Sequence, residues 1–156
     1  MLNINVLVHD LGLSQFNFYM IKTLNRWAMD KIAQPIVFFE TASPICVKPH
    51  FAIMQMSEAW LQPGITLATT PQTATKLGGF PRCSRKLLYV WDLWWLRPQY
   101  RTYQSISQIF LNKDIELIAR SEPHAFAIKN CFNRTVVGIA DNFQLQELLE
   151  NGTKTI

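Results

Sequence analysis

KLLYVWDLWWLRP, residues 86–98, is the most informative stretch of this sequence for the fold. Apolar and aromatic residues run without a break up to Asp92, and Arg97 and Pro98 close the stretch. A continuous apolar run with such boundaries is typical of a strand buried on both faces. Because ligands of open α/β sheets bind beyond the carboxyl ends of the strands, we expect Asp92 at the edge where a site would lie.

Short apolar runs alternate with helical patterns on both sides of this stretch. The clearest helix is expected after Ser14, a favourable N-cap, and it should reach about residue 31. Its stripe has helical spacing and consists of Leu13, Phe16, Met20, Leu24 and Trp27. The other expected strands lie at residues 4–8, 35–40, 51–56, 65–69, 115–119 and 135–139. The pattern predicts an α/β fold, a three-layer Rossmann-like domain whose mainly parallel sheet has about six or seven strands with helices on both faces.

The remaining segments are predicted from local signals. Residues 45–48 could form an edge strand, and Arg82 to Lys86 is interpreted as a basic loop. Asp141 and Gln144 have the spacing of a capping box for a closing helix. We therefore expect one domain over residues 1–150 and a frayed tail at 151–156.

Composition narrows the class of protein. The chain has 156 residues, 49% of them hydrophobic, and a formal charge of +4, which suits an anionic partner or simply a solvated basic surface. Three widely spaced cysteines without a CxxC motif indicate neither a zinc site nor a disulfide framework. Neither a basic leader nor a run of about 18 apolar residues is present, so no membrane span and a cytoplasmic location are expected.

Polar residues collect where the expected strands end, and they are either helix caps or parts of a site. They are His9, Asp10, Glu40, Ser57, Glu58, Thr69, Thr70, Asp92, Ser121, Glu122 and His124. A histidine beside an acid could act as a general base, with Asp92 or Glu122 orienting His9 or His124. The histidines lack metal-ligand spacing, so no metal site is predicted.

Two further features concern phosphates and sugars. The turn at Gly12 could bring backbone close to a phosphate at a helix N-terminus, but DLGLSQ is not GxGxxG, so no dinucleotide cofactor is predicted. Trp94 and Trp95 are followed by Arg97, Tyr100 and Arg101. Tryptophan rings stack on sugars or bases and arginines bind phosphates, although one of the two tryptophans could instead pack in the core.

YVWDLWWLRP, residues 89–98, resembles a strand of the GT-B glycosyltransferases, whose two Rossmann-like domains face each other across a cleft. The family strand ends in His-Asp, often followed by Leu-Trp and a proline. Asp92 and Trp94 stand in matching places here, while Trp91 occupies the position of the histidine. The resemblance is to the amino-terminal, acceptor-side domain.

Two later segments extend this resemblance. ELIARSEPHAFAIKNCFNR, residues 116–134, is similar to the family's next strand and helix, with Ser121 and Glu122 in matching places. TVVGIADNFQLQELLE, residues 135–150, is similar to the segment that closes the first domain, with Asn142 aligned. The compact layout also resembles glycosyltransferase-like proteins of phages and marine microbes.

The resemblance implies hexosyl transfer from a nucleotide sugar, with this chain binding the acceptor and needing no other cofactor. Asp92 would be the base that deprotonates the acceptor hydroxyl, or would orient it, and His9 is the second candidate. The implied substrate-binding residues are Gly12, Ser14, Trp94, Ser121, Glu122 and His124. A separate chain or a second copy in a homodimer would supply the donor-binding domain, since the sequence ends where that domain would begin.

Two alternatives remain open at this point. For a viral source, the acceptor could be DNA bound by the basic segment from Arg82 to Lys86, and the location would be the host cytoplasm. In a different class of function, the chain is a non-catalytic binding or assembly protein built on a Rossmann-like scaffold, because a fold does not determine a function.

Overall fold

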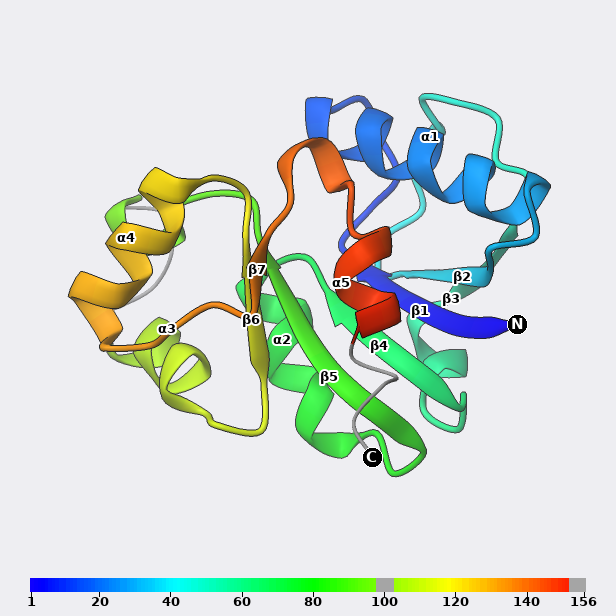
Figure 1. Cartoon of the computed structure of the whole chain (residues 1–156). Coiled ribbons are helices and arrows are strands. Elements are labelled where there is room, and N and C mark those ends of the chain that lie inside the picture. Colours follow the sequence, from blue (N-terminus) through cyan, green and yellow to red (C-terminus); the bar gives the residue numbers. More distant parts are fainter. Residues whose placement is uncertain (98–102, 152–156) are drawn as a thin grey trace.

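The computed structural model describes residues 1–97 and 103–151, and in them the chain forms a seven-stranded sheet (Figure 1). Every neighbouring pair of strands is parallel, and the strand order is β3-β2-β1-β4-β5-β6-β7. The strands are β1 (Leu2–Val8), β2 (Ala33–Phe39), β3 (Ala52–Gln55), β4 (Gly64–Ala68), β5 (Cys83–Val90), β6 (Glu116–Ala119) and β7 (Gly138–Ile139). The prediction of a three-layer, Rossmann-like α/β domain is confirmed.

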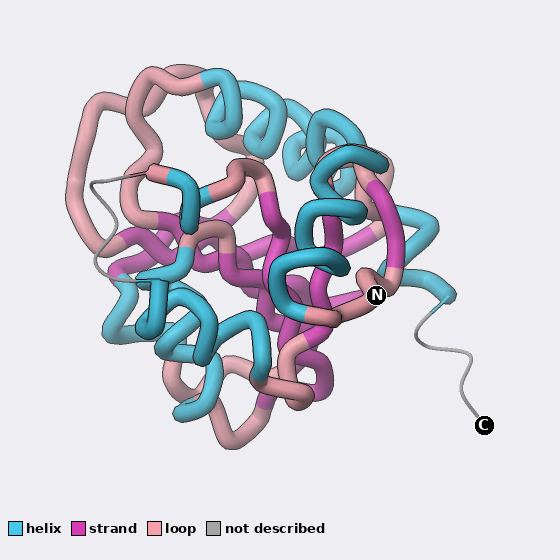
Figure 2. The backbone as a smooth tube through the Cα atoms, turned by 90° about the vertical axis from the view of Figure 1, so that its left-hand side faces the viewer, coloured by secondary structure: helices cyan, strands magenta, loops and turns pink. Residues whose placement is uncertain are grey.

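Helices cover both faces of this sheet, which lies between them when the molecule is turned (Figure 2). The helices are α1 (Gln15–Met29), α2 (Pro71–Lys76), α3 (Tyr103–Leu111), α4 (Glu122–Phe132) and α5 (Gln146–Asn151). Short 3₁₀ turns occupy Met56–Ala59, Leu77–Gly79, Trp94–Leu96 and Asp141–Phe143. One face packs against α1 and α5, and the other against α2, α3 and α4.

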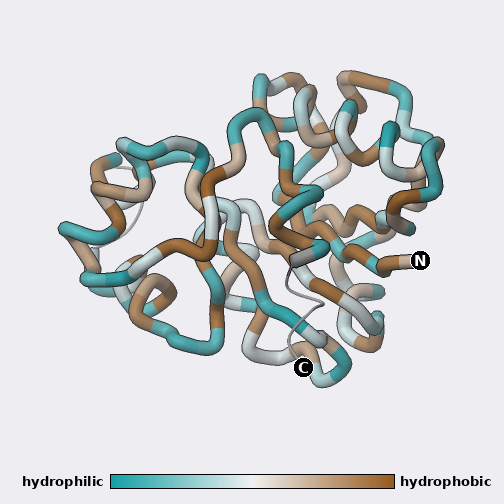
Figure 3. Tube along the Cα trace, viewed as in Figure 1, coloured by the Kyte–Doolittle hydropathy of each residue, from teal (hydrophilic) through white to brown (hydrophobic). Residues whose placement is uncertain are grey.

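Both faces are apolar because the central strands are buried on each side. Along β5, Leu87 and Tyr89 face the core under α1, whereas Leu88 and Val90 face the core under α2 to α4. All four residues are fully buried. Hydrophobic colour accordingly marks the upper part of β5 and the neighbouring β6, whereas hydrophilic and hydrophobic colours alternate in the surrounding helices and loops (Figure 3). The continuous apolar run in the sequence reflects this two-sided burial.

The sheet order reverses between β1 and β4, which lie side by side at the centre. Connections from β1 lead outward through β2 to β3, and connections from β4 lead the other way to β7. Gly64 opens β4 with φ of +109°, and a Cβ there would press on the backbone oxygen of Asn3 in β1. Such a reversal leaves a crevice at the carboxyl ends of the two strands, where ligands bind in folds of this kind.

Local signals predicted several helix boundaries correctly. Ser14 caps α1, its hydroxyl accepting a hydrogen bond from the Asn17 amide at 3.0 Å. Thr70 and Ser121 cap α2 and α4 in the same way. Pro71 is the first residue of α2, as expected from its fixed φ.

Other expectations are wrong at the ends of elements. Leu13 is 92% exposed because it precedes the N-cap of α1. Residues 45–48 form no strand, and the prolines at 44 and 49 flank them without an amide donor. Most of the supposed basic loop belongs to β5, which begins at Cys83.

The carboxyl-terminal elements also differ from the prediction. The last strand is limited to Gly138–Ile139, and no capping box forms between Asp141 and Gln144. Positive φ angles at Asn142 and Phe143 interrupt the chain, so α5 begins only at Gln146. Of the predicted tail, residues 152–156 lie outside the described part of the chain.

Candidate functional site

The candidate site is the carboxyl edge of the sheet, where two groups of polar side chains collect. The switch-point group, at the ends of β1 and β2 and on α2, consists of His9, Glu40 and Lys76. The β5–β6 group consists of Trp91, Asp92, Arg97, Arg120, Ser121 and His124. Among the described residues, no hydrogen bond or ion pair joins the two groups.

The switch-point group is organised around Glu40. His9 Nδ1 lies 3.0 Å from Glu40 Oε2, and Lys76 Nζ lies 3.2 Å from Oε1. Burial alone would raise the pKa of Glu40, but the hydrogen bonds from His9 and Lys76 outweigh it, so this pKa is lowered. Glu40 is therefore an anion at neutral pH. It orients an imidazole that is 56% exposed, and the His9 Nε2 atom is left without a partner in the described structure.

The loop after β1 is closed by its own hydrogen bonds. Asp10 Oδ1 accepts the Gly12 amide at 2.7 Å, and Asn17 donates to the Gly12 carbonyl at 2.9 Å. The predicted approach of the Gly12 amide to a phosphate is therefore unsupported, because Asp10 already occupies that donor. Ser14 acts as the N-cap of α1.

The polar residues after β3 and β4 have structural roles or none. Thr69 is buried, and its hydroxyl donates to the Leu7 carbonyl at 2.8 Å. Thr70 forms a capping box with Thr73. Ser57 and Glu58 lie exposed in the 3₁₀ turn after β3.

Asp92, the first candidate for a catalytic base, lies two residues beyond the end of β5. Its Oδ1 accepts the Leu93 amide at 2.8 Å, and its Oδ2 pairs with Arg97. Both carboxylate oxygens are thus already engaged. The geometry fits a residue that orients its neighbours better than one that takes up a proton.

Trp91 and Arg120 form a contact that sequence reasoning missed. The guanidinium carbon of Arg120 lies 3.7 Å from the centre of the Trp91 ring, in a cation–π stack. Trp91 in turn packs edge-on against Phe16, with ring centroids 5.4 Å apart. The available signal was the position of Arg120 directly after an expected strand, next to Ser121.

His124 and Ser121 lie beside this stack. Ser121 Oγ is 2.7 Å from His124 Nδ1 and also accepts the amide of the same residue at 3.5 Å. Burial and the nearby positive charge of Arg120 lower the pKa of His124, an effect that Asp92 only partly opposes. His124 is consequently neutral at pH 7. Glu122, the remaining candidate at this end, is exposed in the first turn of α4.

The prediction that Trp94 stacks on a ligand is wrong. Its side chain is 4% exposed and belongs to the core under α2 to α4. Trp95 packs edge-on against Phe110 and Phe132, with centroids 5.1 and 4.9 Å away. The aromatic residue at the edge is Trp91 instead. Two other residues singled out from the sequence, Tyr100 and Arg101, lie outside the described residues.

The described residues contain no group of three His, Cys, Asp or Glu side chains that could hold a metal ion. In the same part of the chain, no helix is both long enough and apolar enough to cross a membrane. Comparisons with models of protein families, with curated proteins and with solved structures found no match.

Proposed function

We propose that this chain is a glycosyltransferase-like protein, the acceptor-binding half of a GT-B type transferase. It would bind a hydroxyl-bearing acceptor at its carboxyl edge and act with a donor-binding partner chain or a second copy. The parallel sheet with its reversal between β1 and β4 supports this, because such a reversal creates a crevice for ligands. The sequence resemblance over residues 89–150 supplies the class of reaction.

The observation that carries the proposal is the pairing of His9 with Glu40 at the switch point. Transfer requires a base that removes the acceptor hydroxyl proton as its oxygen attacks the anomeric carbon. A carboxylate on Nδ1 fixes the imidazole and stabilises the imidazolium that forms, while Nε2 accepts the proton. With both oxygens of Asp92 engaged, His9 is the better candidate for the base.

A partner domain facing the carboxyl edge would also explain two exposed apolar residues. Leu13 follows β1 and is 92% exposed, and Leu96 follows β5 and is 67% exposed. Single exposed leucines are common on protein surfaces, but these two lie in loops at the same edge as the site. A second domain across a cleft would contact both.

The alternative, a non-catalytic binding or assembly protein, is favoured by one specific observation. The carboxylates at this edge already have cationic partners, since Arg97 holds Asp92 and Lys76 shares Glu40 with His9. Such pairing leaves the carboxylate oxygens occupied by donors of the protein itself. In this alternative, the same edge binds a ligand without transforming it.

The two functions are separable with the full chain. It would be incubated with nucleotide hexoses and methyl hexosides, with mass spectrometry detecting transfer and NMR detecting glycoside binding. We expect transfer to fall by about 10²-fold or more in His9→Asn, the loss typical of a missing general base. His50→Asn, a change of an exposed histidine before β3, is the matched control and should leave transfer unchanged.

Three other outcomes would each contradict a part of the proposal. Glycoside binding without transfer for every nucleotide hexose, also with any chain that copurifies, would favour the non-catalytic alternative. Absence of glycoside binding would contradict an acceptor-binding role. Transfer that persists in His9→Asn would exclude His9 as the base.

A further inference from the structure

We propose that Arg120, held by its stack on Trp91, anchors a binding site for a phosphate group at the carboxyl ends of β5 and β6. The inference goes beyond the acceptor-binding role and does not rest on it, because a phosphate could bind here whether or not a sugar binds near His9.

Among the described residues, the donors of the Arg120 guanidinium have no acceptor. A guanidinium carries five N–H donors. Within residues 1–97 and 103–151, the Arg120 side chain makes no hydrogen bond and no ion pair, although the residue is partly buried. The other partly buried arginines behave differently: Arg85 binds Glu116, and Arg134 donates to three backbone carbonyls. A partly buried cation without acceptors is costly unless a ligand supplies them.

The orientation of the Arg120 guanidinium is fixed by aromatic contacts. The stack on Trp91, at 3.7 Å, covers one face of the guanidinium and fixes its plane. Trp91 is itself fixed by its edge-on contact with Phe16. Since the N–H groups lie in the guanidinium plane, their fork stays available at the edge of the stack. This fork matches the spacing of phosphate oxygens and allows bidentate binding.

A second donor comes from His124, whose ring is close enough to Arg120 to be affected by its charge. Ser121 Oγ accepts the His124 amide, so its hydroxyl proton is free to donate to His124 Nδ1 at 2.7 Å. A neutral imidazole that accepts at Nδ1 carries its proton on Nε2 and can donate it. The two donors of the arginine fork and this imidazole N–H could each bind a separate oxygen of one phosphate, whereas a carboxylate has only two oxygens to offer.

The acids around this position leave the charge of Arg120 uncompensated at short range. Asp92 acts on His124, but it already pairs with Arg97. Asp141 acts on Tyr89, and its Oδ2 accepts a hydrogen bond from Asn142 at 3.3 Å. Neither carboxylate lies within 4.0 Å of the Arg120 guanidinium, and the exposed Glu122 does not either.

The test is a titration of the full chain followed by ¹H–¹⁵N NMR at the Arg120 Nε–H and Trp91 indole N–H groups. Inorganic phosphate, UDP, acetate and chloride would be added at matched ionic strength. We expect saturable shifts with phosphate that acetate and chloride do not reproduce. Tighter binding of UDP than of inorganic phosphate would identify a nucleoside diphosphate as the source of the group, and equal affinity would indicate free phosphate.

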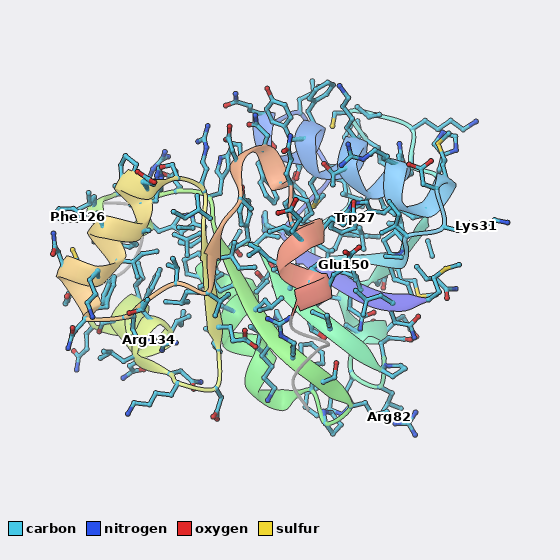
Figure 4. All side chains as sticks on the ribbon, viewed as in Figure 1. Trp27, Lys31, Arg82, Phe126, Arg134 and Glu150 are labelled. Atoms are coloured by element: carbon cyan, nitrogen blue, oxygen red, sulfur yellow. The ribbon has the colours of Figure 1, made fainter. Side chains whose placement is uncertain are left out.

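Variants localise the site. Arg120→Gln should weaken phosphate binding by at least about tenfold, and Arg120→Lys by about fivefold, because lysine keeps the charge but loses the planar fork. The matched control is Arg82→Gln, which removes the same charge at the opposite edge of the sheet, where Arg82 points outward (Figure 4). It should change the Kd by less than about twofold, since exposed charges act weakly over such a distance in salt.

Three results would overturn the inference: shifts that do not saturate, acetate binding as tight as that of phosphate, or equal losses in Arg82→Gln and Arg120→Gln. Arg120→Lys decides the matter if Arg120→Gln fails to fold, because it keeps the stacked cation. Glycoside binding measured on the same samples reports on the acceptor role separately, so failure of one proposal is distinguishable from failure of the other.

Discussion

Arg85, in β5, and Arg120, the residue directly after β6, are both partly buried arginines, but they lie at opposite edges of the sheet. Arg85 donates from Nε and Nη2 to the two oxygens of Glu116, at 2.9 and 2.6 Å, and from Nη1 to the Leu148 carbonyl at 3.4 Å. Arg120 contacts an aromatic face and binds no acceptor in the described structure. Both residues are partly buried, so it is the satisfaction of the donors that separates an arginine that stabilises the fold from one available to a ligand.

The difference follows from what covers each edge. At the amino edge, β5 and β6 pair with Leu87 opposite Glu116, which places the carboxylate within reach of Arg85. The residue Leu148 of α5 then closes over the pair and accepts a third hydrogen bond. At the carboxyl edge, the guanidinium of Arg120 stacks on Trp91, and no described residue forms a hydrogen bond or an ion pair with it. The arginine at the amino edge therefore has its donors satisfied within the fold, whereas in the described structure the arginine at the carboxyl edge does not.

The largest expected effect is the loss of stability on replacing Arg85, compared with the loss on replacing Arg120. Arg85→Gln should lower the free energy of unfolding by about 2 kcal/mol, because it leaves the Glu116 carboxylate without its charged partner in a partly buried place. Arg120→Gln should change it by less than about 0.5 kcal/mol, since no hydrogen bond is lost. Urea denaturation of both variants measures the difference.

A double-mutant cycle provides the control for this prediction. Glu116→Gln combined with Arg85→Gln should cost less than the sum of the single changes, because neither charge is then left alone. Equal destabilisation by Arg85→Gln and Arg120→Gln would contradict the comparison and make Arg120 a structural residue.

Tyr89 is a buried residue of β5, four positions after Arg85. It tests, without a charge, whether satisfied hydrogen bonds of a buried side chain stabilise the fold. Its hydroxyl donates to the Ala140 carbonyl at 2.6 Å and accepts the Phe143 amide at 3.3 Å. Tyr89→Phe leaves both backbone groups unpaired and should cost about 1.5 kcal/mol. As with Arg85, the loss comes from satisfied hydrogen bonds rather than from lost volume, and urea denaturation at pH 7 measures it.

The pH dependence of the free energy of unfolding tests whether the Tyr89 hydroxyl is held in its protonated form by the fold. Burial raises the pKa of Tyr89 to about 12, with the Phe143 amide and Arg120 lowering it and Asp141 raising it to a smaller extent. The folded state therefore disfavours the phenolate. The stabilising contribution is complete below the ordinary tyrosine pKa near 10 and disappears as the pH rises through about 12. Tyr89→Phe should lack this alkaline loss; an identical loss in the variant would contradict the assignment.

The sequence was sufficient for the fold because the central strands are buried on both faces and so appear as continuous apolar runs. It was insufficient for the site, because contacts there depend on where each strand ends. β5 ends at Val90, so Trp91 stays at the edge, while the 3₁₀ turn at Trp94 directs that ring into the core. Trp91 and Trp94 are only three positions apart, and no local pattern distinguishes these two outcomes.

The partners of charged residues were equally hard to predict. Arg85 lies 31 residues from Glu116, and only the pairing of β5 with β6 brings them together. The His9–Glu40 contact has the same separation and depends on the pairing of β1 with β2. Helix caps were predictable because their partner lies three residues away, as at Ser14 and Ser121.

A smaller effect is expected on the ionisation of His124. Its pKa is lowered by burial first and by Arg120 second, while Asp92 acts in the opposite direction. Arg120→Gln should therefore raise the pKa of His124, whereas Arg82→Gln should leave it unchanged. Titration of the imidazole ¹⁵N shifts measures both. An unchanged pKa in Arg120→Gln would mean that the guanidinium does not lie beside this imidazole.

The lowered pKa of His124 also determines how stability depends on pH. The unfolded chain binds a proton at higher pH than the folded chain does, so protonation favours unfolding. The stability tied to a neutral His124 is complete above the ordinary histidine pKa near 6.5 and decreases as the pH falls through the lower folded value. His124→Asn should remove this part of the acid sensitivity.

The smallest expected effect on stability is at the switch-point group, which is ordered by ion pairs like the amino edge but is more exposed. His9→Asn and Lys76→Gln should each change the free energy of unfolding by less than about 0.5 kcal/mol, because exposed pairs contribute little.

Both substitutions should instead raise the pKa of Glu40, since hydrogen bonds from these two residues hold this pKa below its usual value against the effect of burial. Carboxyl ¹³C titration measures this shift, with Lys113→Gln as the exposed-lysine control. The stability that depends on ionised Glu40 is complete above pH of about 4.5 and disappears as the pH falls through the lower folded pKa. A large loss of stability at neutral pH in His9→Asn would place this group with Arg85, as part of the framework, and would count against its proposed role as a base.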